Sequence, residues 1–308
     1  MDYDYAEMLP EKLAWRYREY SFRLRRWLAD RGVIQSGKDY TPFVLLCDTR
    51  TGSTMLASML RHHPDVLMFS ELFRADMWDR VPFREDGFRR RSRDPEVRRL
   101  RKNDPVKFLK EEIFRSWPAS IEAVGFKLMY SHGRVQPMWW DDPDDEERWN
   151  PGRKVFWRAR SDPWEYIYND EEIKVIHLTR RNYLNRVLSI VRAKRTGEWE
   201  VRKGKTSERR EVYIDPEYCK SEFEVYERKV KEEEEKLSNK DRIKIEYENL
   251  KSKREEEIEK VIKNVGISKR KMSPNTKKQV KKNTSKAIQN YEELESYFEE
   301  TKWNRFFE

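Results

Sequence analysis

The sequence is poor in cysteine and histidine, and this scarcity excludes several classes of protein. Its 308 residues include only two cysteines, Cys47 and Cys219, and four histidines. Their spacing matches neither a disulfide framework nor a zinc site. We therefore expect neither a disulfide-stabilised secreted domain nor a zinc module, and a reduced, cytoplasmic compartment is the simplest expectation.

Long apolar runs are missing as well. No stretch approaches the ~18 apolar residues of a membrane-spanning helix, and residues 1–20 lack the apolar centre of a signal peptide. Hydrophobic residues make up 37% of the chain and charged residues 40%, so we expect a modest core, a highly charged surface and no transmembrane segment. Aromatic residues, at 13%, argue against general disorder.

Negative charge is in deficit, since the formal net charge at pH 7 is +9. Such a balance favours anionic partners. Nucleic acid, an acidic glycan, a membrane surface and a polyphosphorylated nucleotide all fit, and charge alone does not choose among them.

The N-terminal region has the pattern of a basic amphipathic helix, over residues 11–31. Its residues available for packing are Trp15, Phe22, Leu24, Trp27 and Leu28. We expect this helix to lie across the domain with its arginines in solvent. A helix lying on a membrane surface is the alternative.

Further along the chain, five short apolar runs are separated by helical patterns. The runs cover residues 43–47, 65–73, 123–129, 174–179 and 241–250, of which the second and fifth include a turn. Strands that alternate with helices indicate an α/β protein. We expect a central parallel sheet of about five strands with helices on both faces.

The first apolar run passes directly into residues 48–54, DTRTGST, and then into a helical pattern. A strand that turns into a helix N-terminus directs several backbone N–H groups and the positive end of the helix dipole at one place. Gly52 allows close approach of the backbone, and Ser53 and Thr54 add hydroxyl donors. Arg50 adds a cation that can bind two oxygens at once. The pattern predicts a phosphate-type anion site, although an ordinary helix N-cap beside a coincidental arginine gives the same local sequence.

The lysine of the common phosphate-binding loop is missing here. The pattern G-x-x-x-x-G-K-[ST] does not occur, so the usual lysine and the Mg²⁺-binding hydroxyl that follows it are absent. This absence argues against an ordinary kinase or ATPase and leaves a divergent kinase as an alternative.

A second anion site is predicted at the end of the fourth run. Arg181 follows that strand, and Ser189 comes eight residues later in a helical pattern. Ligands of parallel sheets bind beyond the carboxyl ends of the strands, so Arg181 and Arg50 belong to the same edge. Two phosphate sites on one edge suit a nucleotide with phosphates at both its 5′ and 3′ ends.

These segments resemble the sulfotransferases that use 3′-phosphoadenosine 5′-phosphosulfate (PAPS), especially their bacterial and carbohydrate-directed branch. DTRTGSTML is similar to the family's 5′-phosphosulfate loop, VIHLTRRNYLNRVLS to its 3′-phosphate motif, and IKIEYENL to a later strand and turn. The resemblance implies a P-loop-like sulfotransferase fold, PAPS bound without a metal, and adenosine 3′,5′-bisphosphate as the product.

The resemblance also implies roles for particular residues. The cofactor-binding residues it implies are Arg50, Thr51, Gly52, Ser53 and Thr54 for the 5′ end, Arg181 and Ser189 for the 3′-phosphate, and Tyr247 near the adenine. The C-terminal region resembles the tails of bacterial-type members, in which Lys281 and Ser285 are candidates to reach the cofactor. The chain departs from the family at Asp48-Thr49, where a proline usually precedes the loop's basic residue, and it lacks the Lys-Gly-x-x-Gly signature of the aryl and steroid branch.

A base must take the proton of the acceptor hydroxyl. Glu71 follows the second strand at the same edge, and related carbohydrate sulfotransferases place a glutamate base in a similar segment. His132 is the alternative base, and Lys127 is a candidate to contact the transferring group. An ion pair of Glu71 with Arg74, a surface histidine and a solvated lysine are the structural alternatives.

We therefore expect a PAPS-dependent sulfotransferase that acts on a hydroxyl of a glycan or glycolipid, including anionic ones. A divergent kinase and a basic nucleic-acid-binding protein are the alternatives, although no recognised nucleic-acid motif occurs. We expect one domain over residues 1–308, with a helical extension (1–40), a catalytic core (41–267) and a helical C-terminal segment (268–308). Within it, residues 74–104 are expected to form a surface insertion and residues 136–170 a long functional loop.

Overall fold

The computed structural model describes residues 11–74, 81, 89–133, 160–199, 211–270, 272 and 284–307. Its centre is a five-stranded parallel sheet in the order β3-β5-β2-β6-β7. The strands are β2 (Thr41–Cys47), β3 (Val66–Glu71), β5 (Ala123–Met129), β6 (Lys174–Thr179) and β7 (Arg242–Glu246). The expected α/β class, with about five parallel strands flanked by helices, is confirmed.

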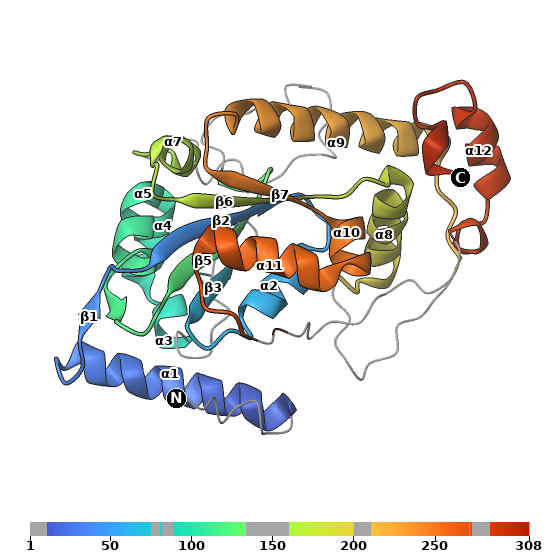
Figure 1. Cartoon of the computed structure of the whole chain (residues 1–308). Coiled ribbons are helices and arrows are strands. Elements are labelled where there is room, and N and C mark those ends of the chain that lie inside the picture. Colours follow the sequence, from blue (N-terminus) through green and yellow to red (C-terminus); the bar gives the residue numbers. More distant parts are fainter. Residues whose placement is uncertain are drawn as a thin grey trace.

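Both faces of the sheet are covered by helices (Figure 1). Phe43, Leu45 and Cys47 of β2 pack on the face that carries α2 (Ser53–Leu60) and α11 (Arg254–Val265). Val44 and Leu46 pack on the opposite face, with residues of α5 (Pro105–Phe108), α7 (Pro163–Asn169) and α9 (Pro216–Lys236). A strand buried on both faces has no need of alternating polar residues, which explains the continuous apolar runs of the sequence.

Five helices begin directly after an aspartate or asparagine whose side chain accepts a hydrogen bond from an N–H of the first turn, as N-cap residues do. They are α4 (Pro95–Asn103), α5, α7, α8 (Tyr183–Thr196) and α9. The remaining elements include α1 (Glu11–Asp30), α3 (Arg89–Ser92), a π-helical turn (Leu109–Ile113), α10 (Tyr247–Ser252), α12 (Tyr291–Phe298), and 3₁₀ turns at Ser285–Ala287 and Asn304–Phe306. A two-residue strand, β1 (Ser36–Gly37), pairs antiparallel with β4 (Trp117–Pro118).

Some of the expected loops contain packed helices. The described part of the expected surface insertion forms α3 and α4, and the buried Arg101 of α4 donates a 3.0 Å hydrogen bond to the carbonyl of Leu72. The described end of the expected loop 136–170 contains α7. The C-terminal region is not one continuous helix, because residues 266–270 and 299–303 are non-helical.

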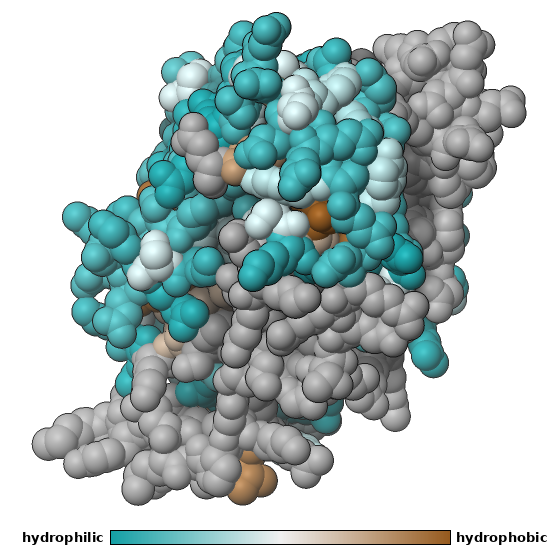
Figure 2. Space-filling model, turned by 90° about the vertical axis from the view of Figure 1, so that its right-hand side faces the viewer, coloured by the Kyte–Doolittle hydropathy of each residue, from teal (hydrophilic) through white to brown (hydrophobic). Residues whose placement is uncertain are grey.

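The N-terminal helix does not pack as expected. Phe22 of α1 is buried, but Leu24 and Trp27, which were expected to face the domain, are 58% and 49% exposed. In the part of the chain that is described, no helix is long and apolar enough to cross a membrane. The described part of the face in Figure 2 is mostly hydrophilic, as the 40% content of charged residues leads one to expect.

The strand order determines where a ligand site can form. From the central β2 the chain goes to β3 and β5 on one side, then to β6 and β7 on the other. The loop that follows β2 therefore lies where the connections diverge, at the carboxyl ends of the strands. This is the place where open parallel sheets bind their ligands.

Candidate active site

The loop between β2 and α2 has an unusual backbone. Arg50 has a φ of 62° and Gly52 a φ of 88°, so two residues of one short loop are left-handed. Positive φ is uncommon for a residue with a side chain. The hydroxyl of the buried Thr51 donates to the carbonyl of Asp48 at 2.8 Å, which helps to fix this shape. The side chain of Thr51 therefore stabilises the loop, and a ligand could contact only the backbone of this residue.

The loop leads into a helix whose N-terminus is open. Gly52 is the N-cap of α2 and supplies no side-chain cap, so the first N–H groups of the helix lack partners within it. A Cβ on Gly52 would lie 2.3 Å from Cδ2 of Tyr247, which shows that this aromatic ring packs directly on the glycine. Ser53 is buried and Thr54 is half-buried. Glycine is thus required both by the backbone conformation and by the contact with Tyr247.

Arg50 joins this loop to α8. Its Nε donates to Oγ of Ser189 at 2.8 Å, and its Nη1 donates to the carbonyl of Trp199 at 2.5 Å. Nη1 of Arg180 in turn donates to the carbonyl of Arg50 at 2.9 Å, and the Arg180 guanidinium lies 4.7 Å from the centre of the Tyr247 ring. The structure thus brings together four predicted residues (Arg50, Gly52, Ser189 and Tyr247) and adds Arg180, which the sequence analysis did not select.

Two neighbouring cations are costly in a partly buried place. Burial and the positive charge of Arg180 lower the pKa of Arg50 to about 10. Burial also lowers the pKa of Arg180. An anion bound between them would offset both effects, so the electrostatics of the loop favour a negatively charged ligand.

Arg181 lies at the same edge but has other partners. Its Nη2 donates to Oδ1 of Asn249 at 3.1 Å, and its Nε lies 3.3 Å from a carboxylate oxygen of Glu246. Its backbone N–H donates to Glu248 at 3.0 Å. The guanidinium is largely exposed, whereas Ser189 is buried beside Arg50. The two residues of the predicted 3′-phosphate pair therefore have different environments in this structure.

A second cluster lies at the ends of β3 and β5. Glu71 and Lys127 are partners in the strand register, and the Lys127 Nζ is 2.6 Å from Oε1 of Glu71. Arg74 approaches the same carboxylate at 3.7 Å. Burial would raise the pKa of Glu71, but the charges of Lys127 and His132 and the hydrogen bond from Lys127 lower it to about 2. The carboxylate is therefore ionised at neutral pH, with His132 close enough to influence it.

A network of buried charges supports the loop from behind. Nη2 of Arg186 lies 3.1 Å from the Asp48 carboxylate, and Nζ of Lys229 lies 3.7 Å from it. Arg186 also donates to Glu222 at 3.1 Å and to the carbonyl of Thr49 at 3.2 Å. Burial would raise the pKa of Asp48, but Lys229 and Arg186 lower it. At Asp48, where the loop departs from the family pattern, the carboxylate is thus paired with Arg186 of α8.

The remaining candidates lie away from these contacts. Ser285 is next to Thr284, whose hydroxyl donates to Asn185 in the first turn of α8 at 3.0 Å, so this tail segment borders the helix that carries Ser189. Lys281 lies outside the described residues. Cys47 and Cys219 are free and buried, and burial raises the pKa of each thiol to about 12. Such thiols are poor nucleophiles at neutral pH.

The other three histidines lie away from these clusters. His63 Nε2 lies 2.9 Å from the carbonyl of Ser268. His177 Nε2 lies 2.7 Å from the Tyr130 hydroxyl, and burial lowers the pKa of this histidine to about 4. His62 is buried at the end of α2. None of them lies in the loop or in the Glu71 cluster.

A model of the sulfotransferase family matches residues 42–271. The chain belongs to the sulfotransferase family. The match starts in β2 and includes all five strands of the sheet, whereas α1 and α12 lie outside it. A search of curated proteins gave no significant match. Membership of this sulfotransferase family identifies the chain as a transferase of sulfuryl groups, and the loop after β2 lies within the matched region.

Proposed function

We propose that this sulfotransferase transfers the sulfuryl group of PAPS to a hydroxyl of a carbohydrate acceptor. The observation that carries the proposal is the pair of partly buried arginines at the open N-terminus of α2, where burial and the charge of Arg180 lower the pKa of Arg50. The 5′ end of the nucleotide fits this place because backbone N–H groups and two cations meet there. PAPS supplies the sulfuryl group, and the protein supplies binding and charge.

The 3′-phosphate is assigned to Ser189 and Arg181. Ser189 lies beside Arg50, and Arg181 can exchange its contacts with Glu246 and Asn249 for a phosphate, since its guanidinium is largely exposed. Tyr247 packs on Gly52 and is well placed to border the nucleoside. These assignments follow the family motifs.

Glu71 is proposed to accept the proton of the acceptor hydroxyl. It is ionised, but a carboxylate with a pKa of about 2 is a weak base while Lys127 holds it. We infer that Lys127 turns toward the charge that develops on the transferring oxygens, which raises the pKa of Glu71 when a base is needed. His132 is the alternative base because its charge reaches the same carboxylate.

The acceptor class is proposed from the resemblance to carbohydrate-directed members, and the net charge of +9 favours an anionic glycan or glycolipid. Most of the tryptophan-rich segment 139–168 and part of the arginine-rich segment 80–101 lie outside the described residues. Stacking of the tryptophans on sugar rings and contact of the arginines with an anionic acceptor are therefore predictions from the sequence alone.

Calorimetric titration with adenosine 3′,5′-bisphosphate tests the cofactor assignment, with 5′-AMP and ATP–Mg²⁺ in parallel. We expect tight binding of the bisphosphate, much weaker binding of AMP and no effect of Mg²⁺. Preference for ATP–Mg²⁺ would support the divergent kinase instead. Salt-sensitive binding of oligonucleotides without bisphosphate binding would support the nucleic-acid-binding protein.

Two variants test the assignments of individual residues, one by binding and one by turnover. Arg181→Ala should weaken PAPS binding far more than binding of adenosine phosphosulfate, which lacks the 3′-phosphate. Glu71→Gln should keep bisphosphate binding but lose turnover by roughly 10²–10⁴-fold, as expected for loss of a general base. If Glu71→Gln retains turnover and His132→Ala loses it, the base is His132.

A further inference from the structure

Helix α1 has two faces that point in opposite directions. Phe22, Arg25 and Arg26 face the body of the protein, where Phe22 is buried and Arg25 contacts residues of two loops. Successive residues of an α-helix are turned by about 100°, so positions 13, 17, 20, 24 and 27 lie on the opposite side. These positions hold large apolar or aromatic side chains that are between 44% and 65% exposed: Leu13, Tyr17, Tyr20, Leu24 and Trp27. We call these five residues the outer stripe.

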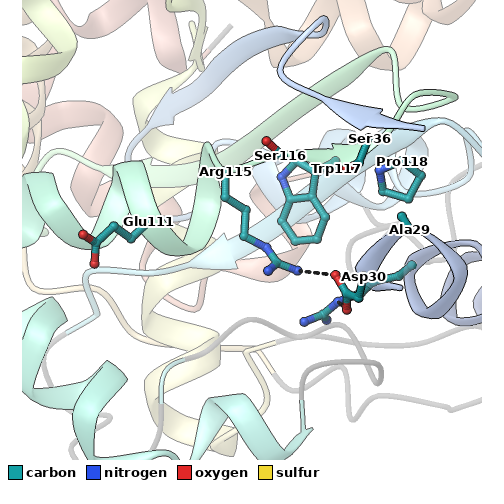
Figure 3. A pocket seen from close by; sticks show the side chains of 9 residues that line it. Ala29, Asp30, Ser36, Glu111, Arg115, Ser116, Trp117 and Pro118 are labelled. Carbon is teal, nitrogen blue, oxygen red and sulfur yellow. Dashed lines mark ion pairs between the residues drawn. The ribbon is translucent and has the colours of Figure 1, made fainter. Parts of the chain in front are cut away.

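The attachment of α1 to the body is largely polar. Nη1 of Arg25 lies 3.0 Å from the Asp65 carboxylate and 2.6 Å from the Ser120 hydroxyl. Arg26 lies over the ring of Trp117, at 5.7 Å from its centre. Between the end of α1 and the body is a cavity of about 350 Å³, which the ion pair of Asp30 and Arg115 spans at 3.9 Å (Figure 3). The apolar side of α1 therefore does not hold this helix in place.

This arrangement is the reverse of an ordinary surface helix, which buries its apolar stripe and exposes its polar one. The outer stripe repeats at spacings of four and three residues over about four turns, so its side chains form one continuous strip. Continuous exposed apolar surface of this kind marks a place where a protein meets a membrane or another protein.

Charge decides between these occupants. Residues 11–31 contain seven basic and three acidic residues. The Arg31 guanidinium lies 4.0 Å from the centre of the Trp27 ring, and that of Arg23 lies 5.9 Å from the Tyr20 ring, so cations border the outer stripe. A second copy of the chain would bring two basic helices together, which like charges oppose. A surface with a negatively charged outer layer over an apolar interior fits both the outer stripe and the cations that border it.

We propose that α1 binds the surface of a lipid bilayer that contains anionic lipids. The helix lies parallel to the membrane, with Leu13, Leu24 and Trp27 at the boundary of headgroups and acyl chains. Tyrosine and tryptophan are the aromatic residues that favour this depth, and the bordering arginines contact the anionic headgroups.

The position of α1 keeps the active site accessible in this orientation. Asp65 and Ser120, which bind Arg25, precede β3 and β5 and therefore lie at the amino ends of the strands. The loop of Arg50 lies at the carboxyl ends. A membrane bound to α1 thus holds one edge of the sheet and leaves the opposite edge open to substrates.

Flotation of the full chain with vesicles tests the proposal. Vesicles of phosphatidylcholine alone are compared with vesicles that also contain phosphatidylserine. We expect phosphatidylserine to raise the partition coefficient by roughly 10–100-fold, and high salt to reverse most of this gain. Absence of binding to the anionic vesicles would overturn the proposal, and this comparison needs no variant.

A double variant, Leu24→Asp with Trp27→Asp, locates the contact. It should weaken binding to the anionic vesicles roughly tenfold or more. Val33→Asp is the matched control, because Val33 is 64% exposed and lies beyond the end of α1. Equal binding by the double variant and the control would overturn the proposal. So would a dimer in sedimentation velocity that the double variant converts to monomer, because the occupant would then be a second copy. Circular dichroism verifies that each variant is folded.

Discussion

Two groups of cations meet at the loop that follows β2, one half-buried and one buried, and their surroundings differ. Arg50 and Arg180 contact a hydroxyl, two carbonyls and an aromatic ring, and Nε of Arg180 lies 4.0 Å from the Glu248 carboxylate. Arg186 and Lys229 both approach the Asp48 carboxylate. Burial lowers the pKa of Arg50, whereas the charges of Asp48 and Glu222 outweigh burial and raise the pKa of Arg186.

We interpret this difference as one between scaffold and candidate binding site. The chain supplies a carboxylate to Arg186 and Lys229, whereas Arg50 and Arg180 lie beside each other, so that the charge of Arg180 adds to burial in lowering the pKa of Arg50. The first group therefore holds the loop in place whether or not a ligand is bound. We propose that an anionic ligand stabilises the second group.

The strongest test exchanges one arginine from each group for methionine. Arg186→Met leaves Asp48 and Glu222 with fewer positive partners, so we expect a loss of about 3–5 kcal/mol in the free energy of unfolding. Arg50→Met should change that free energy by about 1 kcal/mol or less, but lower turnover by about 10²–10³-fold, as loss of a charge-stabilising donor does. Urea unfolding and initial rates with labelled PAPS measure the two effects.

Asp48→Asn is the matched control for the scaffold, since it removes the same ion pair from the other side. It should lower the free energy of unfolding to a similar extent as Arg186→Met. If Arg50→Met is the more destabilising arginine variant, the two groups have been assigned the wrong way round.

A smaller effect is expected from acid, and it sharpens the comparison because Glu71 is a paired carboxylate of the candidate active site. Its pKa is about 2 in the folded protein and higher in the unfolded chain. The resulting stability is present above pH ~4.5 and is lost as the pH falls toward ~2, with a magnitude on the order of 3 kcal/mol. Unfolding curves at several pH values should show this loss. In the Glu71→Gln variant, the free energy of unfolding should depend less on pH in the same range. An unchanged pH dependence would mean that the ion pair between Lys127 and Glu71 does not form when the protein is in solution.

The smallest effect is expected at Gly52. Gly52→Ala places a methyl group against Tyr247 and gives a side chain to a left-handed residue, which we expect to cost about 1–2 kcal/mol and to weaken bisphosphate binding roughly tenfold. Gly197→Ala is the control, because Gly197 has a similar φ of 69° but open space around its Cα. Equal bisphosphate affinities in the two variants would mean that the contact between Gly52 and Tyr247 does not contribute to binding.

The fold could be predicted from the sequence because its signals are local. A buried parallel strand is a short apolar run, and the runs at β2, β5 and β6 agree closely with the observed strands. The turn from β2 into α2 could also be expected, because Gly52 directly precedes a helical pattern, whereas its use as an anion site stays a prediction. Arg50 and Ser189 are 139 residues apart, and their hydrogen bond could be expected only through the family motifs.

Other features depend on tertiary contacts that no local pattern reveals. Arg180 and Arg181 are adjacent in the sequence, and only the fold shows that Arg180 contacts the loop while Arg181 binds Glu246 and Asn249. The partner of Asp48 lies on α8, so its departure from the family pattern could be noted but not explained. The pattern of α1 was read correctly as amphipathic. Of the residues expected to pack, Phe22 is buried, but Leu24 and Trp27 are exposed, and Arg25 contacts the body in addition to Phe22.

The strand order also has a consequence for the order of events during synthesis. β2 is the first strand of the central sheet to be made, but its two neighbours, β5 and β6, begin only at residues 123 and 174. At roughly 5–20 residues per second, translation from the end of β2 to the start of β6 takes about 6–25 s. For that time the nascent chain carries an apolar strand with at least one unpaired edge, and we expect chaperones near the ribosome to bind it. The central strand of the sheet is thus synthesised early, but both of its edges can be paired only after more than half of the chain has been translated.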